Sequence, residues 1–250
     1  MLLHEVTDDL LTLFDDARSV AVLTGAGISA ESGVPTFRGG GDSEVWTWRG
    51  RPVTELSSAE LLATDPKLVW EWFDHRRGIL TGLEPNPGHR ALADWERRFS
   101  DFTLITQNID DLHRAAGNMH VLELHGNIWR ARCLACSSTF EARECPLKIS
   151  PPTCLACEGP SRPDVVLFGE LLPEGVFERA EESSRRADLF FVIGTSAVVY
   201  PAASLPVAAK QSGARLIEVN PEPTDISFMC DVTLLGKAGD ILPQFLKERG

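Results

Sequence analysis

The sequence predicts an α/β protein with a doubly wound parallel sheet and a smaller, discontinuous second domain. Short apolar runs rich in β-branched residues alternate with longer amphipathic stretches, as strands and helices do in such folds. A Gly-rich turn follows the first of the buried runs directly, as in Rossmann-like nucleotide-binding domains. Two segments interrupt the alternation, and one of them contains two Cys-x-x-Cys pairs.

The expected elements follow one another as strand and helix. Strands are predicted at Ser19–Thr24, Phe102–Thr106, Val121–Leu124, Leu189–Ile193 and Arg215–Val219. Helices are predicted near Asp8–Arg18, Gly88–Phe99, Glu174–Arg186, Ser204–Ser212 and Ala238–Glu248. Short connections favour parallel strands, and such sheets bind ligands at the carboxyl ends of their strands.

Two insertions are expected to form the second domain. The Trp-rich segment 39–85 predicts a helical module with helices near Ser58–Thr64 and Pro66–Leu80, and segment 129–163 predicts a metal-binding module. Both insertions are joined to the parent domain at each end, so the small domain is discontinuous in sequence. The Rossmann-like domain takes the remaining segments, which are 1–38, 86–128 and 164–250.

The totals indicate a globular chain of 250 residues, of which 43% are hydrophobic. A net charge of −12 argues against non-specific binding to nucleic acid. The N-terminus has no basic stretch before an apolar core, and no run approaches the roughly 20 apolar residues of a membrane span. We therefore expect a cytoplasmic protein without a membrane partner. Its oligomeric state stays open, and a monomer is compatible with the sequence.

The pairs Cys133-Leu-Ala-Cys136 and Cys154-Leu-Ala-Cys157 predict a four-thiolate Zn²⁺ site. Each tight turn directs two thiolates to one side, and two turns complete a tetrahedron around the ion. Four protein ligands leave no coordination position for water, so the ion is expected to be structural. Cys145 and Cys230 remain outside this set, and each is interpreted as a spare or buried thiol.

The first of these predicted strands leads into Gly25-Ala-Gly-Ile-Ser-Ala-Glu-Ser-Gly33. A Gly-rich turn between a strand and a helix presents backbone N–H groups to a phosphate, and glycine lets a diphosphate approach closely. The match to G-x-G-x-x-G is imperfect because Ala30 stands at the third glycine, so a tight structural turn is the alternative interpretation. The continuation places Phe37 and Arg38 directly beyond the predicted phosphate site.

Polar residues gather where the next two strands end. Thr106-Gln-Asn-Ile-Asp110 ends one strand, and a helix cap would explain Asn108 or Asp110 but not three polar groups together. His125 follows the strand Val121–Leu124. A histidine there is placed to act as a general base near neutral pH, although a lone histidine is more often structural.

Two further strands end in Gly194-Thr-Ser196 and Val219-Asn220, which suit contacts with phosphate, ribose or adenine. In order and spacing, the motifs of the chain resemble those of the sirtuins, which are NAD-dependent protein-lysine deacylases. The resemblance covers nearly the whole chain and is to bacterial and archaeal members, partly to the desuccinylase-like class III group. It rests on Gly25-Ala-Gly-Ile-Ser29, Pro35-Thr-Phe-Arg38, Thr106-Gln-Asn-Ile-Asp110, Leu124-His-Gly126, the two Cys-x-x-Cys pairs, Val166-Leu-Phe-Gly-Glu170, Gly194-Thr-Ser196 and Val219-Asn220.

The resemblance implies a reaction in which NAD is consumed as a substrate. The acyl-lysine carbonyl oxygen attacks the nicotinamide ribose, nicotinamide leaves, and the acyl group departs on ADP-ribose while free lysine is released. By similarity, His125 is the general base for the ribose hydroxyls, and Asn108 and Asp110 orient the ribose and nicotinamide. These three are the implied catalytic residues. A site that excludes water protects such a reaction from hydrolysis.

The resemblance also implies which residues contact each substrate. The residues implied in NAD binding are Gly25, Ala26, Gly27, Ser29, Glu31, Pro35, Thr36, Phe37, Arg38, Gln107, Asn108, Ile109, Asp110, His125, Gly194, Thr195, Ser196, Asn220, Pro221, Glu222 and Ala238. Those implied in binding an acyl-lysine protein or peptide are Phe73, Arg76, Val166, Phe168, Gly169 and Val199. The peptide is expected to add as a strand between the Val166–Glu170 strand and the Val198–Tyr200 loop, with ordinary strand core as the alternative interpretation of the former.

The acyl preference depends on a shorter motif. Sirtuins that remove succinyl or malonyl groups carry a Tyr and an Arg three residues apart on the helix that here reads Trp70-Glu-Trp-Phe-Asp-His-Arg-Arg77. Arg76 matches the arginine and would pair with an acyl carboxylate, whereas Phe73 replaces the tyrosine. The pattern is half met, so deacetylation is the default expectation and acidic acyl groups stay open. A solvated surface arginine is the alternative interpretation of Arg76.

Three other functions compete with lysine deacylation. Protein mono-ADP-ribosyl transfer would use the same NAD site, but its release of nicotinamide would not require an acylated lysine. A zinc-ribbon module for nucleic acid conflicts with the charge of −12 and with a zinc segment that lacks a basic cluster. An NAD dehydrogenase with a structural zinc does not explain Thr106–Asp110 or the Phe37-Arg38 loop.

Overall fold

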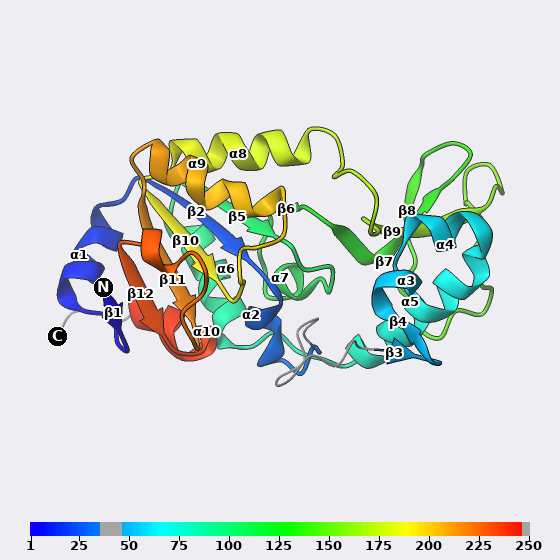
Figure 1. Ribbon diagram of the computed structural model, residues 1–250, viewed down its shortest axis with the longest axis horizontal. Coiled ribbons are helices and arrows are strands. Elements are labelled where there is room, and N and C mark those ends of the chain that lie inside the picture. The colour runs from blue at the N-terminus through cyan, green and yellow to red at the C-terminus, as the bar shows by residue number, and fades with distance from the viewer. Residues whose placement is uncertain (36–46, 247–250) are drawn as a thin grey trace.

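The computed structural model describes residues 1–35 and 47–246 of the chain. A larger part is built on one broad sheet, and a smaller part with its own short strands lies beside it, to the right in Figure 1. Within the described residues, we find no helix that is both long and apolar enough to cross a membrane.

The large sheet is parallel throughout and has the strand order β1-β12-β11-β10-β2-β5-β6. The bounds are β1 Leu2–Leu3, β2 Ser19–Thr24, β5 Asp101–Thr106, β6 Val121–Glu123, β10 Leu189–Ile193, β11 Arg215–Asn220 and β12 Val232–Leu235. Because the strands are parallel, their carboxyl ends meet at one edge of the sheet. Strand β2 lies between β10 and β5, so its Gly-rich turn faces the ends of both neighbours.

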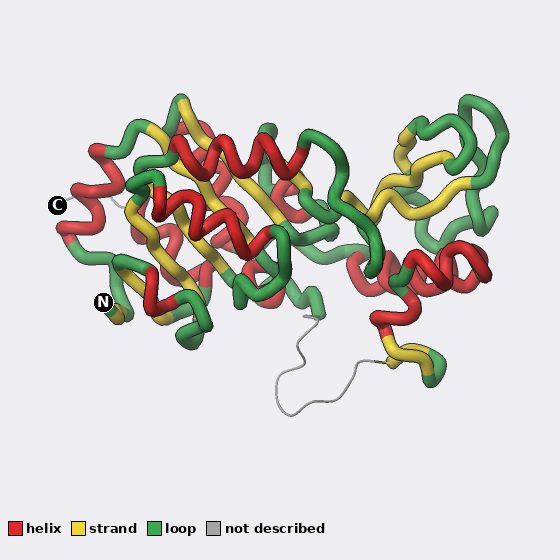
Figure 2. Tube along the Cα trace, turned by 45° about the horizontal axis from the view of Figure 1, so that its top comes forward, coloured by secondary structure: helices red, strands yellow, loops and turns green. Residues whose placement is uncertain are grey.

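Helices cover both faces of this sheet, as Figure 2 shows. On β2, Val20 and Val22 pack with the layer that contains α1 and α6, whereas Ala21 and Leu23 pack with the layer that contains α8 and α9. This alternation confirms the predicted doubly wound fold. The helices of this part are α1 Asp8–Asp16, α2 Ala26–Ala30, α6 Pro87–Arg98, α7 Leu112–Ala115, α8 Val176–Arg186, α9 Leu205–Gln211 and α10 Ala238–Ile241, with 3₁₀ turns at Ala202–Ser204, Ser227–Met229 and Leu242–Leu246.

The smaller part combines an antiparallel sheet with short helices. Its sheet has the order β8-β7-β9, and a β3-β4 hairpin lies near the helices. Helix α5 begins where Asp65 accepts a hydrogen bond from the Leu68 amide and Pro66 takes the first helical position. The bounds are β3 Thr47–Trp48, β4 Arg51–Pro52, β7 Gly126–Cys133, β8 Thr139–Glu141, β9 Ser161–Val165, α3 Val53–Leu56, α4 Ala59–Thr64 and α5 Pro66–Leu80.

One apolar cluster joins the two insertions. Trp72 and Phe73 of α5 pack with Ile128 and Val165, which flank segment 129–163. Trp70 packs with Ala131 and Ala142 inside that segment, and its indole donates to the Ser161 carbonyl at 2.9 Å. The helices and the metal-binding segment therefore share a core, although they are far apart in the sequence.

The predicted bounds are confirmed for the strands Ser19–Thr24 and Leu189–Ile193 and for the helix Pro66–Leu80. The prediction of a strand at Val166–Glu170 is wrong, because β9 ends at Val165. The Leu167 amide instead donates to the Glu170 carboxylate, and the Phe168 amide donates to the Ser57 carbonyl. This segment is therefore a loop tied to α3 and α4.

Candidate active site at the carboxyl edge of the sheet

The Gly-rich turn after β2 packs directly on the end of β10. The Gly27 N–H donates to the Gly194 carbonyl at 2.7 Å. A Cβ on Gly27 would lie 2.7 Å from the Gly194 Cα, and one on Gly25 would lie 2.5 Å from the Thr195 Cβ, so both positions require glycine. Because the protein itself uses the Gly27 amide, fewer free amides face a phosphate than the motif alone predicts.

The Asn108 side chain connects this turn to the end of β5. Its Nδ2 donates to the Gly25 carbonyl at 3.0 Å and to the Ser29 hydroxyl at 3.1 Å. Beside it, the Gln107 Nε2 donates to the Thr195 hydroxyl at 3.0 Å. Three strand ends predicted to contact NAD, those of β2, β5 and β10, are thus joined by side-chain hydrogen bonds.

Asp110 is buried below this junction. Its carboxylate accepts from the Leu112 amide at 2.9 Å, and Asp110 stands one residue before Asp111, which is the N-cap of α7 and makes no side-chain cap hydrogen bond. The pKa of Asp110 is raised, chiefly by burial, while hydrogen bonds from Leu112 and Ser29 oppose the shift. A buried carboxylate that is held next to Asn108 is compatible with a role toward a ligand.

His125 is held on two sides by backbone hydrogen bonds. Its Nδ1 lies 2.9 Å from the Gln107 carbonyl oxygen, and its own carbonyl accepts from the Val166 amide at 2.9 Å. Because a carbonyl oxygen only accepts, Nδ1 carries the proton and Nε2 is the basic nitrogen. Within the described part of the chain, Nε2 has no hydrogen-bond partner. Burial lowers the pKa of His125 from 6.5, and the Gln107 hydrogen bond opposes that shift, so the ring is neutral at pH 7.

The opposite end of the site is formed by the ends of β10 and β11. The Asn220 Nδ2 donates to the Thr195 carbonyl at 3.1 Å, which links the two predicted adenosine-side motifs. Ser196 is half-buried, Ala238 is buried at the start of α10, and Pro221 and Glu222 are exposed. Among the other NAD-side residues, Ala26, Glu31, Pro35 and Ile109 are half-buried, and the Glu31 carboxylate accepts from the Gly239 amide at 3.0 Å.

Sequence analysis missed a pair of buried histidines beneath the Gly-rich turn. The His89 Nε2 lies 3.3 Å from the Ser29 hydroxyl, and the His113 Nε2 lies 2.9 Å from the Thr24 hydroxyl. The two ring centroids are 4.9 Å apart. Burial lowers both pKa values, that of His89 to about 4, so both rings are neutral.

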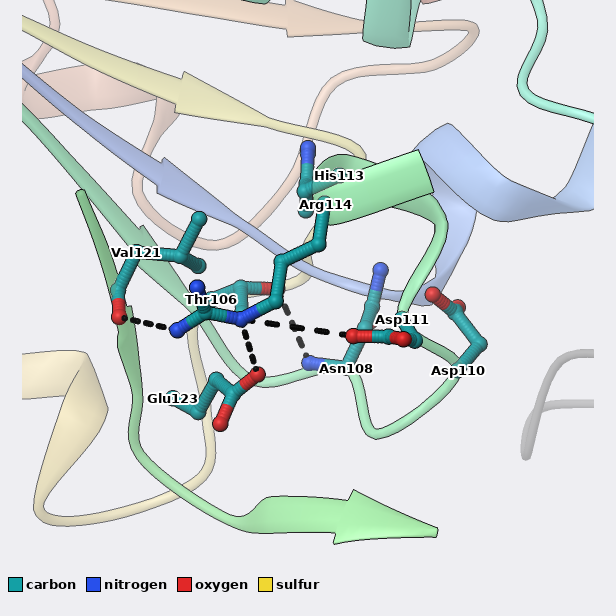
Figure 3. A pocket seen from close by; sticks show the side chains of 8 residues that line it. All are labelled: Thr106, Asn108, Asp110, Asp111, His113, Arg114, Val121 and Glu123. Atoms are coloured by element: carbon teal, nitrogen blue, oxygen red, sulfur yellow. Dashed lines mark hydrogen bonds and ion pairs between the residues drawn. The ribbon is translucent and has the colours of Figure 1, made fainter. Parts of the chain in front are cut away.

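Two strand carboxylates were also missed, one buried and one half-buried. Glu218 of β11 accepts hydrogen bonds from Thr224, Ser227 and Thr233 and orders the loop after Asn220. Glu123 lines a recess with Arg114 and Asp111, shown in Figure 3. The available signal was an acidic residue inside an otherwise apolar predicted strand, since such a residue must find partners when it is buried.

The residues predicted to hold the acylated peptide are divided between the core and the surface. Phe73 is part of the apolar cluster on α5, whereas Phe168, Gly169 and Val199 are exposed and Val166 is half-buried. Arg76 is buried rather than solvated. Its pKa is lowered to about 10 by burial, and the Asp110 carboxylate opposes that shift. Thr36, Phe37 and Arg38 lie outside the described residues.

The four predicted zinc ligands come together. All four Sγ atoms lie within 4.8 Å of one another, with Cys133 and Cys157 at 3.5 Å and Cys136 and Cys154 at 3.7 Å. A Zn²⁺ ion with Zn–S bonds of about 2.3 Å separates its thiolates by about 3.8 Å, so the cluster fits the ion. The Ala135 and Ala156 amides donate to Cys133 and Cys154. Cys145 and Cys230 lie outside the cluster, and burial raises the pKa of Cys230 to about 12.

Fold and site together define a nucleotide-binding α/β protein with a four-thiolate zinc module. The model of the Sir2 family matches residues 25–201. The NAD-dependent protein deacylase of Aquifex aeolicus is 47% identical over 234 residues, which cover 92% of this chain and 96% of that protein. The chain belongs to the Sir2 family.

Solved structures agree with this assignment. The crystal structure of a Sir2 homologue in complex with NAD aligns with a TM-score of 0.89 and 42% identity, covering 98% of this chain and 94% of the other. A Sir2 protein bound to a deacetylated p53 peptide and 3′-O-acetyl ADP-ribose aligns with a TM-score of 0.82 and 31% identity, covering 95% and 96%.

The zinc cluster leads to a prediction with a matched control. Cys154→Ser should lower the bound zinc from one equivalent toward none and lower the thermal midpoint, because the cluster ties the end of β7 to the segment before β9. Cys145→Ser should leave both unchanged. The measurements are metal content by mass spectrometry and thermal unfolding. Full zinc content in Cys154→Ser would contradict the assignment.

Proposed function

We propose that this chain is an NAD-dependent protein-lysine deacylase, with deacetylation as its default activity. The observation that carries the proposal is His125: a buried, neutral imidazole whose Nδ1 proton is fixed on Gln107 and whose Nε2 remains available at the edge where Asn108 and the Gly-rich turn meet. Belonging to the Sir2 family supports the same function.

The residues at this edge fit NAD. Gly25 and Gly27 leave no Cβ in the turn, Asn108 and Asp110 lie beside it, and the β10 and β11 ends offer Thr195 and Asn220 for the adenosine side. When bound, NAD supplies a labile glycosidic bond whose cleavage drives acyl transfer from lysine to ADP-ribose. The remaining residues of the proposed NAD site are Ala26, Ser29, Glu31, Pro35, Thr36, Phe37, Arg38, Gln107, Ile109, Gly194, Ser196, Pro221, Glu222 and Ala238.

The proposed task of His125 is to take a proton at Nε2 from a ribose hydroxyl. Nδ1 already donates to Gln107, so the imidazolium that forms keeps this hydrogen bond, and the carbonyl stabilises its charge. Asp110 is held in place by the Leu112 amide, and Asn108 by Gly25 and Ser29, so both can orient a ligand without rearranging.

We assign the zinc cluster a structural part in this reaction. It closes the β7–β9 sheet, and the Val166 amide that holds His125 comes directly after β9. Segments 39–85 and 129–163 then form a small domain against the NAD-binding domain of segments 1–38, 86–128 and 164–250. Chelation of zinc should reduce activity by loosening this wall rather than by removing a catalytic ion.

The proposed protein substrates carry acyl-lysine, and their peptide lies along Val166, Phe168, Gly169 and Val199. The amides of residues 166–168 already donate to His125, Glu170 and Ser57, so strand addition must use other groups of this loop and the Val198–Tyr200 loop. Phe168 is 53% exposed and Val199 is 51% exposed, which leaves apolar surface for the peptide.

The proposed mechanism gives a prediction for His125. His125→Ala should reduce acyl removal from an acetyl-lysine peptide by at least about 100-fold, because the general base is lost, while NAD still binds. In the unchanged protein, the rate should fall with decreasing pH through an apparent pKa below 6.5, because burial disfavours the charged ring. Liquid chromatography of the peptide and calorimetry with NAD measure the two effects.

Retained turnover in His125→Ala would refute the proposed mechanism. Nicotinamide release that proceeds equally without acylated peptide would instead favour mono-ADP-ribosyl transfer or simple hydrolysis of NAD.

Another prediction concerns the acyl group. Arg76→Met should lower the rate on succinyl-lysine by about tenfold more than the rate on acetyl-lysine, because a charge-assisted hydrogen bond to the acyl carboxylate is lost. Arg97→Met, on the exposed side of α6, is the control. The measurement is turnover of matched peptides that differ only in the acyl group. An unchanged ratio of the two rates would remove Arg76 from the acyl site.

A further inference from the structure

Glu123 ends β6, two residues before His125, and is bound from both sides of the turn that carries the histidine. Its side chain is 11% exposed. Its carboxylate accepts from the Arg114 Nε at 3.0 Å, from the Asn127 Nδ2 at 3.0 Å and from the Arg130 Nη2 at 2.7 Å. Figure 3 shows Arg114 reaching from α7 toward Glu123 and Asp111.

The backbone has little freedom where this turn enters β7. β6 ends at Glu123 and β7 begins at Gly126, so Leu124 and His125 are the whole connection between these two strands. Gly126 has a φ of +78°, and a Cβ there would collide with the Asp164 carbonyl oxygen. The direction in which β7 leaves the large sheet is therefore set tightly against β9.

An ion-pair chain crosses this connection. Arg130 of β7 binds Glu123 on one side and donates to the Asp164 carboxylate of β9 at 3.0 Å on the other. The pKa of Glu123 is lowered: burial alone would raise it, but the contacts with Asn127, Arg130 and Arg114 outweigh burial. Glu123 is therefore ionised at neutral pH and links the last strand of the large sheet to the zinc-binding sheet.

The two hydrogen bonds that hold His125 belong to the same two parts. Its Nδ1 binds Gln107, at the end of β5 in the large sheet, and its carbonyl binds Val166, directly after β9. The ring keeps its place only if these two partners keep their spacing. The chain Glu123–Arg130–Asp164 spans the same gap on the flank of the turn.

We propose that Glu123 is a positioning residue for His125, fixing the Nε2 of the histidine through Arg130 and Asp164. This inference rests on the proposed deacylase function. Displacing a catalytic group by about 1 Å can cost about 100-fold in rate, so a clamp that acts on the two anchors of His125 affects the chemistry without touching a substrate.

The test separates the step that uses His125 from the steps before it. Glu123→Gln keeps the shape of the side chain and removes its charge. With one acetyl-lysine peptide, exchange of labelled nicotinamide into NAD reports the steps before proton transfer, and release of the deacetylated peptide reports the whole reaction. We expect peptide release to fall by about tenfold or more, because Nε2 is displaced, while exchange changes little.

Three further variants make the result specific. Arg130→Met should produce the same selective loss, and the double variant should lose little more, because both residues act through one chain. Asp101→Asn is the matched control, since it breaks an exposed bidentate pair with Arg186 at the opposite end of β5. It should leave both rates unchanged.

Equal losses of exchange and peptide release would overturn the proposal, and so would full activity in Glu123→Gln. If thermal unfolding shows that Glu123→Gln does not fold, the same two rates are compared in Arg130→Met. If neither variant folds, the ion pairs Glu123–Arg130–Asp164 serve stability alone and the proposal is overturned. Absence of acyl removal by the unchanged protein would refute the proposed function instead.

Discussion

The site depends on the close contact between two segments of the backbone, the Gly-rich turn after β2 and the end of β10. Gly25 and Gly27 lie so close to Thr195 and Gly194 that neither position has room for a Cβ. Because β5 lies on the other side of β2, Asn108 reaches the same turn and donates to Gly25. Polar groups from separate parts of the sequence are therefore fixed at one edge of the sheet before any ligand binds, which lowers the cost of ordering them.

Burial then determines the protonation state of His125 at this edge of the sheet. It keeps His125 neutral, as a base must be, and the Gln107 carbonyl fixes the proton on Nδ1. The zinc cluster affects the same histidine indirectly, since it closes the sheet whose strand β9 leads to Val166. A structural ion and a catalytic side chain are thus connected through one short segment of backbone.

Much of this could be predicted from sequence, and the exceptions have physical causes. Buried parallel strands such as Leu189–Ile193 are continuous apolar runs, and the four cysteines have a spacing that few other sites use. The two-residue strand β1 carries too little pattern to detect. Val166–Glu170 looked like a strand because it begins with three apolar residues, but the Glu170 carboxylate accepts a hydrogen bond from the Leu167 backbone amide. The acidic residues Glu123 and Glu218 stand out within apolar strands, but their partners lie in turns and loops whose path the strand pattern does not predict.

The most direct test of this account is calorimetric titration of NAD into Gly27→Ala, with Gly78→Ala as the control. An added Cβ at Gly27 would meet the Gly194 backbone, whereas one at Gly78 in α5 meets nothing within 4 Å. We expect Gly27→Ala to remain folded, because the strain is local, and to bind NAD at least about tenfold more weakly, while Gly78→Ala binds normally. Undiminished NAD binding by a folded Gly27→Ala protein would contradict the claim that this backbone contact builds the site.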